Sequence, residues 1–284
     1  MRRLRFKQVD VFTRVPFRGN PVAVVLEADP LSSADMQRVA AWTNLSETTF
    51  VLEPTAPGAD YRLRIFTPRH ELPFAGHPTL GSAHAVLEAG LVKPKGGKFR
   101  QECGAGVLEL ERDGDLTWVK APPQQITPLT GEQKTGLGRT LSSSIVGEPV
   151  VVRVGPVWVV ADLGGSADVD GLTPDMSAIA RFTDALGANG ITVFGATRKG
   201  DGSIHVRSFA PAGGIPEDPV CGSGNISVAA YLSRSGKIDA GGRYTARQGM
   251  SIGRDGEVRL RVEGGAIHLG GEAVTCVEGT LSAG

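Results

Sequence analysis

Cysteine is scarce in this sequence, which contains only Cys103, Cys221 and Cys276 among its 284 residues. An odd number of cysteines without paired metal-ligand spacing excludes both a disulfide framework and a zinc site as the basis of the fold. We therefore expect three free thiols and no bound metal.

An excess of charge of one sign is also missing, because 30 Lys and Arg residues balance 30 Asp and Glu residues. A chain with a net charge of zero lacks the excess of positive charge that would indicate binding to nucleic acid or to an anionic membrane. No stretch is apolar enough to span a bilayer, and the basic start MRRLRFKQVDVF lacks the apolar core of a secretory signal. We expect a cytoplasmic protein whose partner is a small molecule rather than nucleic acid or membrane.

The nucleotide-binding motifs are absent as well. No GxGxxG follows a predicted strand, and the phosphate loop GxxxxGK[ST] does not occur. Nucleotide cofactors are therefore not expected. With 40% hydrophobic and 21% charged residues, the composition is that of a folded globular protein, and the length suits two medium-sized domains.

The most informative feature that is present is an internal repeat. YRLRIFTP at 61–68 and IHVRSFAP at 204–211 share Arg, Phe and Pro in one register, and ELPFAGHPT at 71–79 aligns without a gap to EDPVCGSGN. A fainter match relates PVAVV at 21–25 to PVWVV at 156–160. Duplication is the simplest explanation, and it predicts two halves built on one plan.

Each half is predicted to contain a strand, a glycine-rich turn, a helix and further short strands. The helix of the first half is expected to begin at Pro78 and stop at Gly90, and that of the second half to follow an N-cap at Asn225. Two more helices are expected at 33–43 and 174–186. The other predicted strands are 4–12, 21–27, 48–53, 106–111, 116–120, 150–154, 156–162, 190–195, 257–262 and 266–269.

Strands that outnumber the helices and are joined mainly by hairpins predict an α+β fold. The segment 121–135, rich in Pro, Thr and Gln, is predicted to link the two domains. The N-terminal half then covers 1–120, joined by a C-terminal strand at about 270–284, and the C-terminal half covers 121–269.

The motifs GHPT at 76–79 and GSGN at 222–225 lie where a predicted strand passes into a helix. A helix N-terminus carries unsatisfied N–H groups and a partial positive charge, and it attracts carboxylate or phosphate. A tight turn would explain one such motif alone. Its occurrence at matching places in both halves favours an anion-binding cleft, with Gly76, Gly222 and Gly224 as backbone donors.

Four polar side chains near these motifs are candidates for chemistry. His77 and Ser223 occupy equivalent positions in the two junctions, which makes them candidate substrate ligands. Asp218 is close enough in sequence to reach the same place, although capping the local turn would equally explain it. Glu47 in NLSETTF lies at a predicted loop-to-strand junction, where a solvent-facing or capping role is the simpler interpretation of the residue alone.

GNPVAVV, NLSETTFVL, RIFTPRHELPFAGHPTLG and RSFAP followed by EDPVCGSGN occur in this order. Together they resemble the phenazine-biosynthesis isomerase (PhzF-like) family over nearly the whole chain. The resemblance implies the diaminopimelate epimerase-like fold: two pseudosymmetric domains, each a curved, mostly antiparallel sheet or barrel around a central helix, with the active site between them. It also implies a cofactor-independent isomerase that forms a homodimer.

Within this resemblance, the family's acid/base glutamate falls on Glu47. Its substrate-contacting residues fall on His77, Asp218 and Ser223, and Asn20 of GNPVAVV belongs to the same substrate-binding set. The implied reaction removes a proton from one carbon of a small carboxylate-bearing substrate and returns it to another. A glutamate that acts in both directions near neutral pH needs a raised pKa, which burial would provide.

Cys221 departs from the family pattern, since many members carry Thr there and CGSG resembles the cysteine motif of the epimerases. The equivalent residue of the first half is Ala75. A two-thiol racemase needs a base on each face of the carbon, and Ala75 cannot act as the second base. Cys221 is therefore predicted to be a small residue that lines the pocket. Two alternatives stay open: a racemase or epimerase that uses Cys221 with a second base, and a non-catalytic binding protein with this fold.

Overall fold

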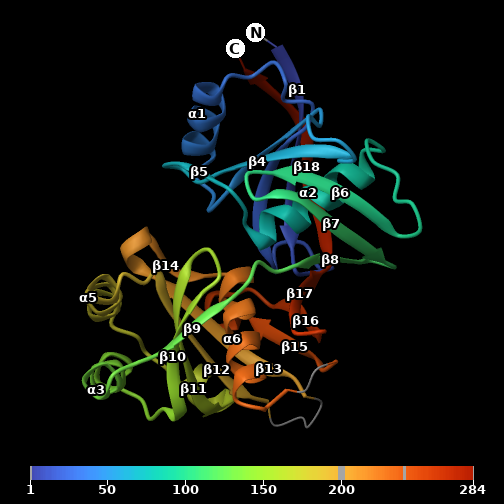
Figure 1. The fold of residues 1–284 in the computed structure, drawn as a ribbon. Coiled ribbons are helices and arrows are strands. Elements are labelled where there is room, and N and C mark those ends of the chain that lie inside the picture. Colours follow the sequence, from blue (N-terminus) through green and yellow to red (C-terminus); the bar gives the residue numbers. More distant parts are fainter. Residues whose placement is uncertain (1, 198–201, 239–240, 284) are drawn as a thin grey trace. The chain divides into compact units, whose positions relative to one another are not determined.

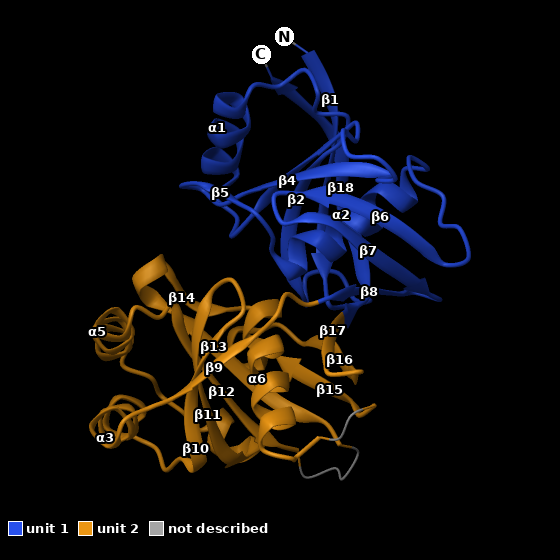
Figure 2. Cartoon of the chain, in the orientation of Figure 1, with its two compact units in different colours: residues 1–120, 270–284 blue, residues 121–269 orange. Residues whose placement is uncertain are grey.

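The computed structural model describes residues 2–197, 202–238 and 241–283. The chain forms two compact units, unit 1 with residues 1–120 and 270–284, and unit 2 with residues 121–269 (Figure 2). Each unit contains a sheet and a helix buried against it, α2 in unit 1 and α6 in unit 2 (Figure 1). The α+β class expected from the sequence is confirmed.

Unit 1 is organised around the strand β1, which pairs in antiparallel fashion with β2 on one side and with β18 on the other. β2 and β3 are parallel, with the helix α1 between them in the chain, and β4 is antiparallel to β3 and parallel to β6. The elements of unit 1 are β1 (Arg2–Val11), β2 (Asn20–Val25), α1 (Ser33–Thr43), β3 (Thr48–Leu52), β4 (Tyr61–Phe66), β5 (Glu71–Leu72), α2 (Gly76–Glu88), β6 (Lys98–Cys103), β7 (Gly106–Asp113), β8 (Leu116–Lys120) and β18 (Ala273–Ala283).

Unit 2 repeats this order of pairings. β10 pairs with β9 and β11, β11 is parallel to β12, and β13 is antiparallel to β12 and parallel to β15. The elements of unit 2 are β9 (Gln125–Pro128), α3 (Gly131–Leu141), β10 (Val146–Arg153), β11 (Val157–Gly165), α4 (Ser166–Asp170), α5 (Met176–Leu186), β12 (Gly190–Ala196), β13 (Ile204–Ala210), the 3-10 turn η1 (Pro211–Gly213), β14 (Ile215–Asp218), α6 (Gly222–Arg234), β15 (Arg243–Gln248), the 3-10 turn η2 (Met250–Ile252), β16 (Gly256–Glu263) and β17 (Ala266–Gly271).

The two central helices are buried over most of their length because small residues let the strands approach them. In α2, a Cβ added at Gly81 would lie 2.4 Å from Val22 Cγ1 of β2. In α6, a Cβ at Gly224 would lie 2.7 Å from the hydroxyl oxygens of Thr192 and Ser208. A larger residue at either glycine would push the helix off its sheet.

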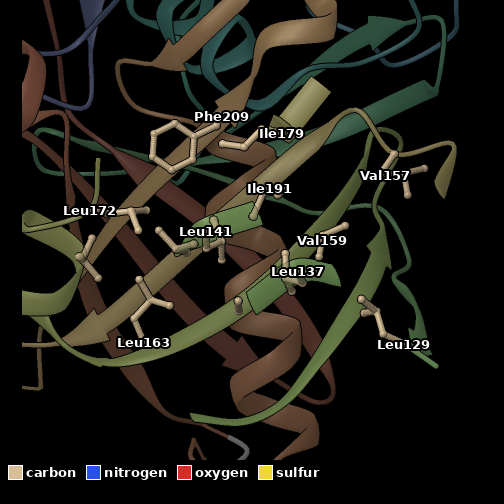
Figure 3. Close-up of a cluster of buried hydrophobic side chains, with 14 residues drawn as sticks. Leu129, Leu137, Leu141, Val157, Val159, Leu163, Leu172, Ile179, Ile191 and Phe209 are labelled. Atoms are coloured by element: carbon tan, nitrogen blue, oxygen red, sulfur yellow. The ribbon is translucent and has the colours of Figure 1, made fainter. Parts of the chain in front are cut away.

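The outer helices pack through apolar side chains. Figure 3 shows this in unit 2, where Leu137 and Leu141 of α3 and Ile179 of α5 lie in one cluster with Ile191 of β12 and Phe209 of β13. All five side chains are almost completely buried. Burying a side chain of this size contributes about 1.5–3 kcal/mol, so the cluster is a main source of stability for unit 2.

Most predicted elements are present, and three expectations need correction. Asn225 is not the N-cap of α6, because the helix begins at Gly222 and Cys221 is its cap. The helix α2 begins at Gly76 rather than at Pro78. The segment 121–135, predicted to link the two domains, belongs to unit 2 and contains β9 and the first turn of α3; the chain passes from unit 1 to unit 2 after Lys120.

Among the helices of the described residues, none has the length and apolar character required to cross a membrane.

Candidate active site

Glu47 lies in the short loop between α1 and β3. Asn44, in the left-handed conformation, ends α1, and the chain enters β3 at Thr48. The hydroxyls of Thr43 and Thr48 are 2.6 Å apart and close the loop across its base. Because a hydrogen bond spans the loop and buried strand residues follow it, Glu47 is held in a defined position.

The Glu47 carboxyl is almost removed from water. Its side chain is 15% exposed, and Oε2 is buried and accepts no hydrogen bond from the residues that the structure describes. Burial raises the pKa of Glu47 from 4.5 to about 7, although a hydrogen bond with the Ser46 side chain acts in the opposite direction. A carboxyl with this pKa is present in both its protonated and ionised forms near neutral pH.

His77 lies beside Glu47. It is the second residue of α2, its side chain is 7% exposed, and its Nδ1 is 3.5 Å from Glu47 Oε2. A hydrogen bond of 2.8 Å between the hydroxyls of Thr49 and Ser82 ties β3 to α2 close by. The structure therefore brings together two of the residues predicted from sequence, and it does so within unit 1.

The other predicted side chains gather at the start of α6 in unit 2. Asp218 ends β14, and its Oδ1 accepts a hydrogen bond from the backbone N–H of Val220 at 3.0 Å, so the carboxylate does cap the local turn. Ser223 is the second residue of α6, as His77 is of α2, and its Oγ accepts a 2.9 Å hydrogen bond from Trp158 Nε1.

Cys221 has a structural role in this turn. Its Sγ accepts a hydrogen bond from the Gly224 N–H at 3.2 Å and caps α6. Burial, together with the nearby charge of Asp218, raises the pKa of the thiol well above its usual value. A buried thiol that is held in its neutral form is a poor base at neutral pH.

Gln248 was not anticipated from the sequence, yet it holds the turn in place. Its Oε1 accepts hydrogen bonds from the Cys221 N–H (3.1 Å) and from Asn225 Nδ2 (2.9 Å), and its Nε2 donates to the Asp218 carbonyl (2.9 Å). In unit 1, Gln101 of β6 also reaches the central helix, but there its Nε2 donates a hydrogen bond to Thr79 Oγ1 of α2 (3.3 Å). Gln248 lies in a strand distant in sequence from the turn, so only the fold reveals the contact.

The glycines and Asn20 of the predicted set are buried. Gly76 and Gly222 are the first residues of α2 and α6, where backbone N–H groups have no partner within a helix. The N–H of Gly224 is already used by Cys221, so this glycine serves close packing. Asn20 begins β2 opposite Val11 and is 1% exposed.

Metal ligands do not converge in the described ranges of the chain, where no group of three or more His, Cys, Asp or Glu side chains is placed to hold an ion. The three cysteines are free thiols, as expected.

The family model of phenazine biosynthesis-like proteins (PhzC-PhzF) matches residues 9–279. The chain belongs to this family. The resemblance seen in the sequence motifs is thereby confirmed, and the matched region includes every residue of the candidate site.

Two relatives of this PhzC-PhzF family member align with it over almost its whole length. Antisense-enhancing sequence 1 of Schizosaccharomyces pombe is 44% identical over 96% of this chain and 97% of its own length. Trans-2,3-dihydro-3-hydroxyanthranilate isomerase of Pseudomonas chlororaphis is 37% identical over 96% of this chain and 97% of its own. The expectation that the family member is an isomerase is confirmed.

A solved structure confirms the fold. The PhzF-family phenazine biosynthesis protein of Bacillus anthracis superposes with a TM-score of 0.86 at 25% sequence identity, covering 99% of this chain and 100% of the other. The PhzC-PhzF fold of two similar α+β halves thus extends over the full chain.

Proposed function

We propose that this isomerase moves a proton from one carbon of a small carboxylate-bearing substrate to another through the side chain of Glu47. The observation that carries the proposal is the buried Glu47 carboxyl, whose pKa lies at about 7. An ionised Glu47 removes the proton, and the carboxylic acid so formed returns it. A carboxyl at its usual pKa would be a weaker base and would seldom be protonated at neutral pH.

The proposal gives His77 and the first turn of α2 the task of stabilising negative charge on the substrate. Removal of a proton from carbon produces an enol-like transition state, which fixed hydrogen-bond donors stabilise. His77 is suited to this role because it is buried at a helix N-terminus, with its Nδ1 3.5 Å from Glu47 Oε2. Donors on a rigid helix need little rearrangement during the reaction.

Substrate binding is assigned to Asp218, Ser223 and the N-terminus of α6. The first-turn N–H groups and the Ser223 hydroxyl suit a carboxylate, which accepts hydrogen bonds only. The Asp218 carboxylate suits a donor such as an amine or hydroxyl on the same molecule. Together they favour a substrate that carries a carboxylate and a polar donor group.

The name of the Pseudomonas chlororaphis relative supplies one compound of this chemistry, trans-2,3-dihydro-3-hydroxyanthranilate, which carries a carboxylate, an amine and a hydroxyl. We propose a substrate of this class and this compound as the first to be assayed. The reaction needs no cofactor, because the proton moves only between the substrate and Glu47.

A thiol base forms no part of the proposal. Cys221 is buried, caps α6 and is held in its neutral form, and the matching residue of unit 1 is Ala75. The chemistry of one carboxyl is therefore favoured over that of two opposed thiols. We also propose that the protein is cytoplasmic and forms a homodimer, since the twofold-symmetric homodimer is the commonest closed assembly.

The experiment is an assay of purified protein on trans-2,3-dihydro-3-hydroxyanthranilate, with Glu47→Gln as the test variant and Glu53→Gln as the matched control. Glu53 is an exposed carboxylate just beyond β3. We expect Glu47→Gln to lower kcat by about 10²- to 10⁴-fold with little change in the binding of 3-hydroxyanthranilate, an aromatic analogue, and Glu53→Gln to leave both unchanged. Turnover that survives in Glu47→Gln would rule out the proposed mechanism.

A further inference from the structure

Trp158 is the residue of unit 2 that connects the sheet to the hydroxyl of Ser223. It lies on β11, is 4% exposed, and its Nε1 is 2.9 Å from Ser223 Oγ. Its ring packs over Gly190, where an added Cβ would lie 2.5 Å from the ring atom Cζ3 and 2.2 Å from the Phe209 carbonyl oxygen. Close packing thus holds the tryptophan ring in addition to its hydrogen bond with Ser223.

The direction of this hydrogen bond is set by chemistry. An indole N–H donates and never accepts, so Ser223 Oγ is the acceptor. A hydroxyl has a single hydrogen, and Trp158 leaves it available for another acceptor. One acceptor within reach is Cys221 Sγ at 3.6 Å, but sulfur is a weak acceptor and this one already receives the Gly224 N–H.

We infer that Trp158 is a positioning residue that turns the Ser223 hydroxyl hydrogen toward the substrate carboxylate. The inference rests on the proposed function, which makes Ser223 a ligand of that carboxylate. The role assigned to Trp158 is exerted through Ser223 and needs no contact of the indole with the substrate or the reacting atoms. Its indole N–H occupies one lone pair of Oγ, so that the hydroxyl meets an incoming anion as a donor without first having to reorient.

This arrangement has a consequence for specificity. A hydroxyl fixed as a donor binds groups that accept hydrogen bonds and disfavours groups that only donate them. Without Trp158, the Ser223 hydroxyl would rotate between orientations, and part of the binding energy would be lost in ordering it. The loss is expected in affinity for the carboxylate rather than in the proton-transfer step.

The test is a double-mutant cycle of Trp158→Phe and Ser223→Ala, read as the Kd for 3-hydroxyanthranilate by calorimetry and as KM and kcat. We expect Trp158→Phe to weaken binding by about fivefold, to raise KM similarly and to leave kcat nearly unchanged. In the Ser223→Ala background, the same Trp158→Phe change should have no further effect. Trp118→Phe is the matched control, since Trp118 is also a buried strand tryptophan packed against a glycine, Gly270.

The outcomes separate the inference from the proposed function. If Ser223→Ala weakens binding and Trp158→Phe weakens it by the same factor in both backgrounds, Trp158 does not act through Ser223 and the inference fails alone. If Ser223→Ala binds as the unaltered protein does, or if the unaltered protein does not bind the probe, the role of Ser223 fails and the inference fails with it. Weaker binding by Trp118→Phe would also overturn the inference, because it would trace the effect to loss of a buried indole in general.

A second measurement leaves Trp158 unchanged, so it does not depend on the folding of Trp158→Phe. The chain has three tryptophans, and their indole N–H signals are resolvable by NMR. We expect one of them to shift upfield in Ser223→Ala, because it loses its acceptor, and to shift again when the probe binds to the unaltered protein. An indole spectrum that Ser223→Ala leaves unchanged would overturn the inference.

Discussion

Arg207 donates two hydrogen bonds to Glu217, both at 2.9 Å, and its guanidinium lies 5.0 Å from the ring centre of Phe209. Arg64 makes the same contacts with Glu71 and Phe66 in unit 1. Each pair joins the two strands that lead into a central helix. The two halves therefore share this ion pair in addition to their arrangement of strands and helix.

The two copies of this ion pair are expected to differ in energy. The side chains of Arg207 and Glu217 are 6% and 7% exposed, whereas those of Arg64 and Glu71 are 18% and 42% exposed. Removing one partner of a buried pair leaves a charge without compensation, so we expect Glu217→Gln to lower the free energy of unfolding by about 3 kcal/mol. The matched change Glu71→Gln should cost about 0.5 kcal/mol. Urea denaturation monitored by circular dichroism measures both, and equal losses would contradict the prediction.

The raised pKa of Glu47 predicts how stability depends on pH. Between pH 4.5 and about 7 the unfolded chain has lost this proton and the folded protein retains it, so stability falls as pH rises through this range. A rise in pKa of this size corresponds to about 3 kcal/mol at most. Because Glu47→Gln has no such proton, we expect its stability relative to the unaltered protein to increase from pH 4.5 to 7 and to level off above. A stability difference that is constant with pH would show that this carboxyl titrates normally.

Cys221 is expected to be dispensable for catalysis. Serine is a strong N-cap, so Cys221→Ser keeps the acceptor for the Gly224 N–H and should change kcat/KM by less than about threefold. Cys221→Ala removes the cap and should lower the free energy of unfolding by about 1 kcal/mol. In the folded protein, an alkylating reagent should modify the less buried Cys103 and Cys276 before Cys221. Loss of turnover in Cys221→Ser would favour the racemase chemistry instead.

The proton's path distinguishes one base from two. A single glutamate must return the proton to the face from which it took it, so the transfer should be suprafacial. During turnover in deuterated water, some hydrogen from the substrate carbon should therefore reappear in the product, as mass spectrometry would detect. A pair of opposed bases would deliver solvent deuterium almost completely in a single turnover. Retained hydrogen at the new carbon is the decisive observation, since a glutamic acid that exchanges quickly with water would also give full deuteration.

The repeat carried most of the sequence-based prediction of the fold. Matching Arg, Glu and glycine positions identified the strand, turn and central helix of both halves, and the helix expected at 33–43 has the bounds of α1. The helix α3 was missed because it contains Gly136 and Gly138 and follows a segment rich in proline, a composition typical of loops. Its buried Leu137 and Leu141 show that tertiary packing outweighs the poor helix propensity.

The candidate site was only partly accessible from sequence. Glu47 has no local feature that separates it from other acidic residues, and its identification came from the family resemblance. Its burial and its position beside His77 depend on the packing of β3 against α2. Trp158 and Gln248 were missed because they lie on strands and reach the turn before α6 only through the sheet. Asn225 was misassigned because asparagine is a common N-cap, whereas the actual cap is a cysteine.

The pairing of β18 with β1 affects how the protein is made. Residues Arg2 and Ala283 are partners in this antiparallel pair, which places the two ends of the chain side by side (Figure 1). In unit 2 the corresponding strand, β9, precedes β10 along the chain with only the helix α3 between them. During synthesis, all strands of unit 2 are therefore made before the last strand of unit 1. Unit 1 cannot complete its sheet until β18 has been synthesised, after the whole of unit 2. A circular permutant that joins the present ends and starts near residue 270 would remove this delay, because each half would then be one continuous stretch of polypeptide.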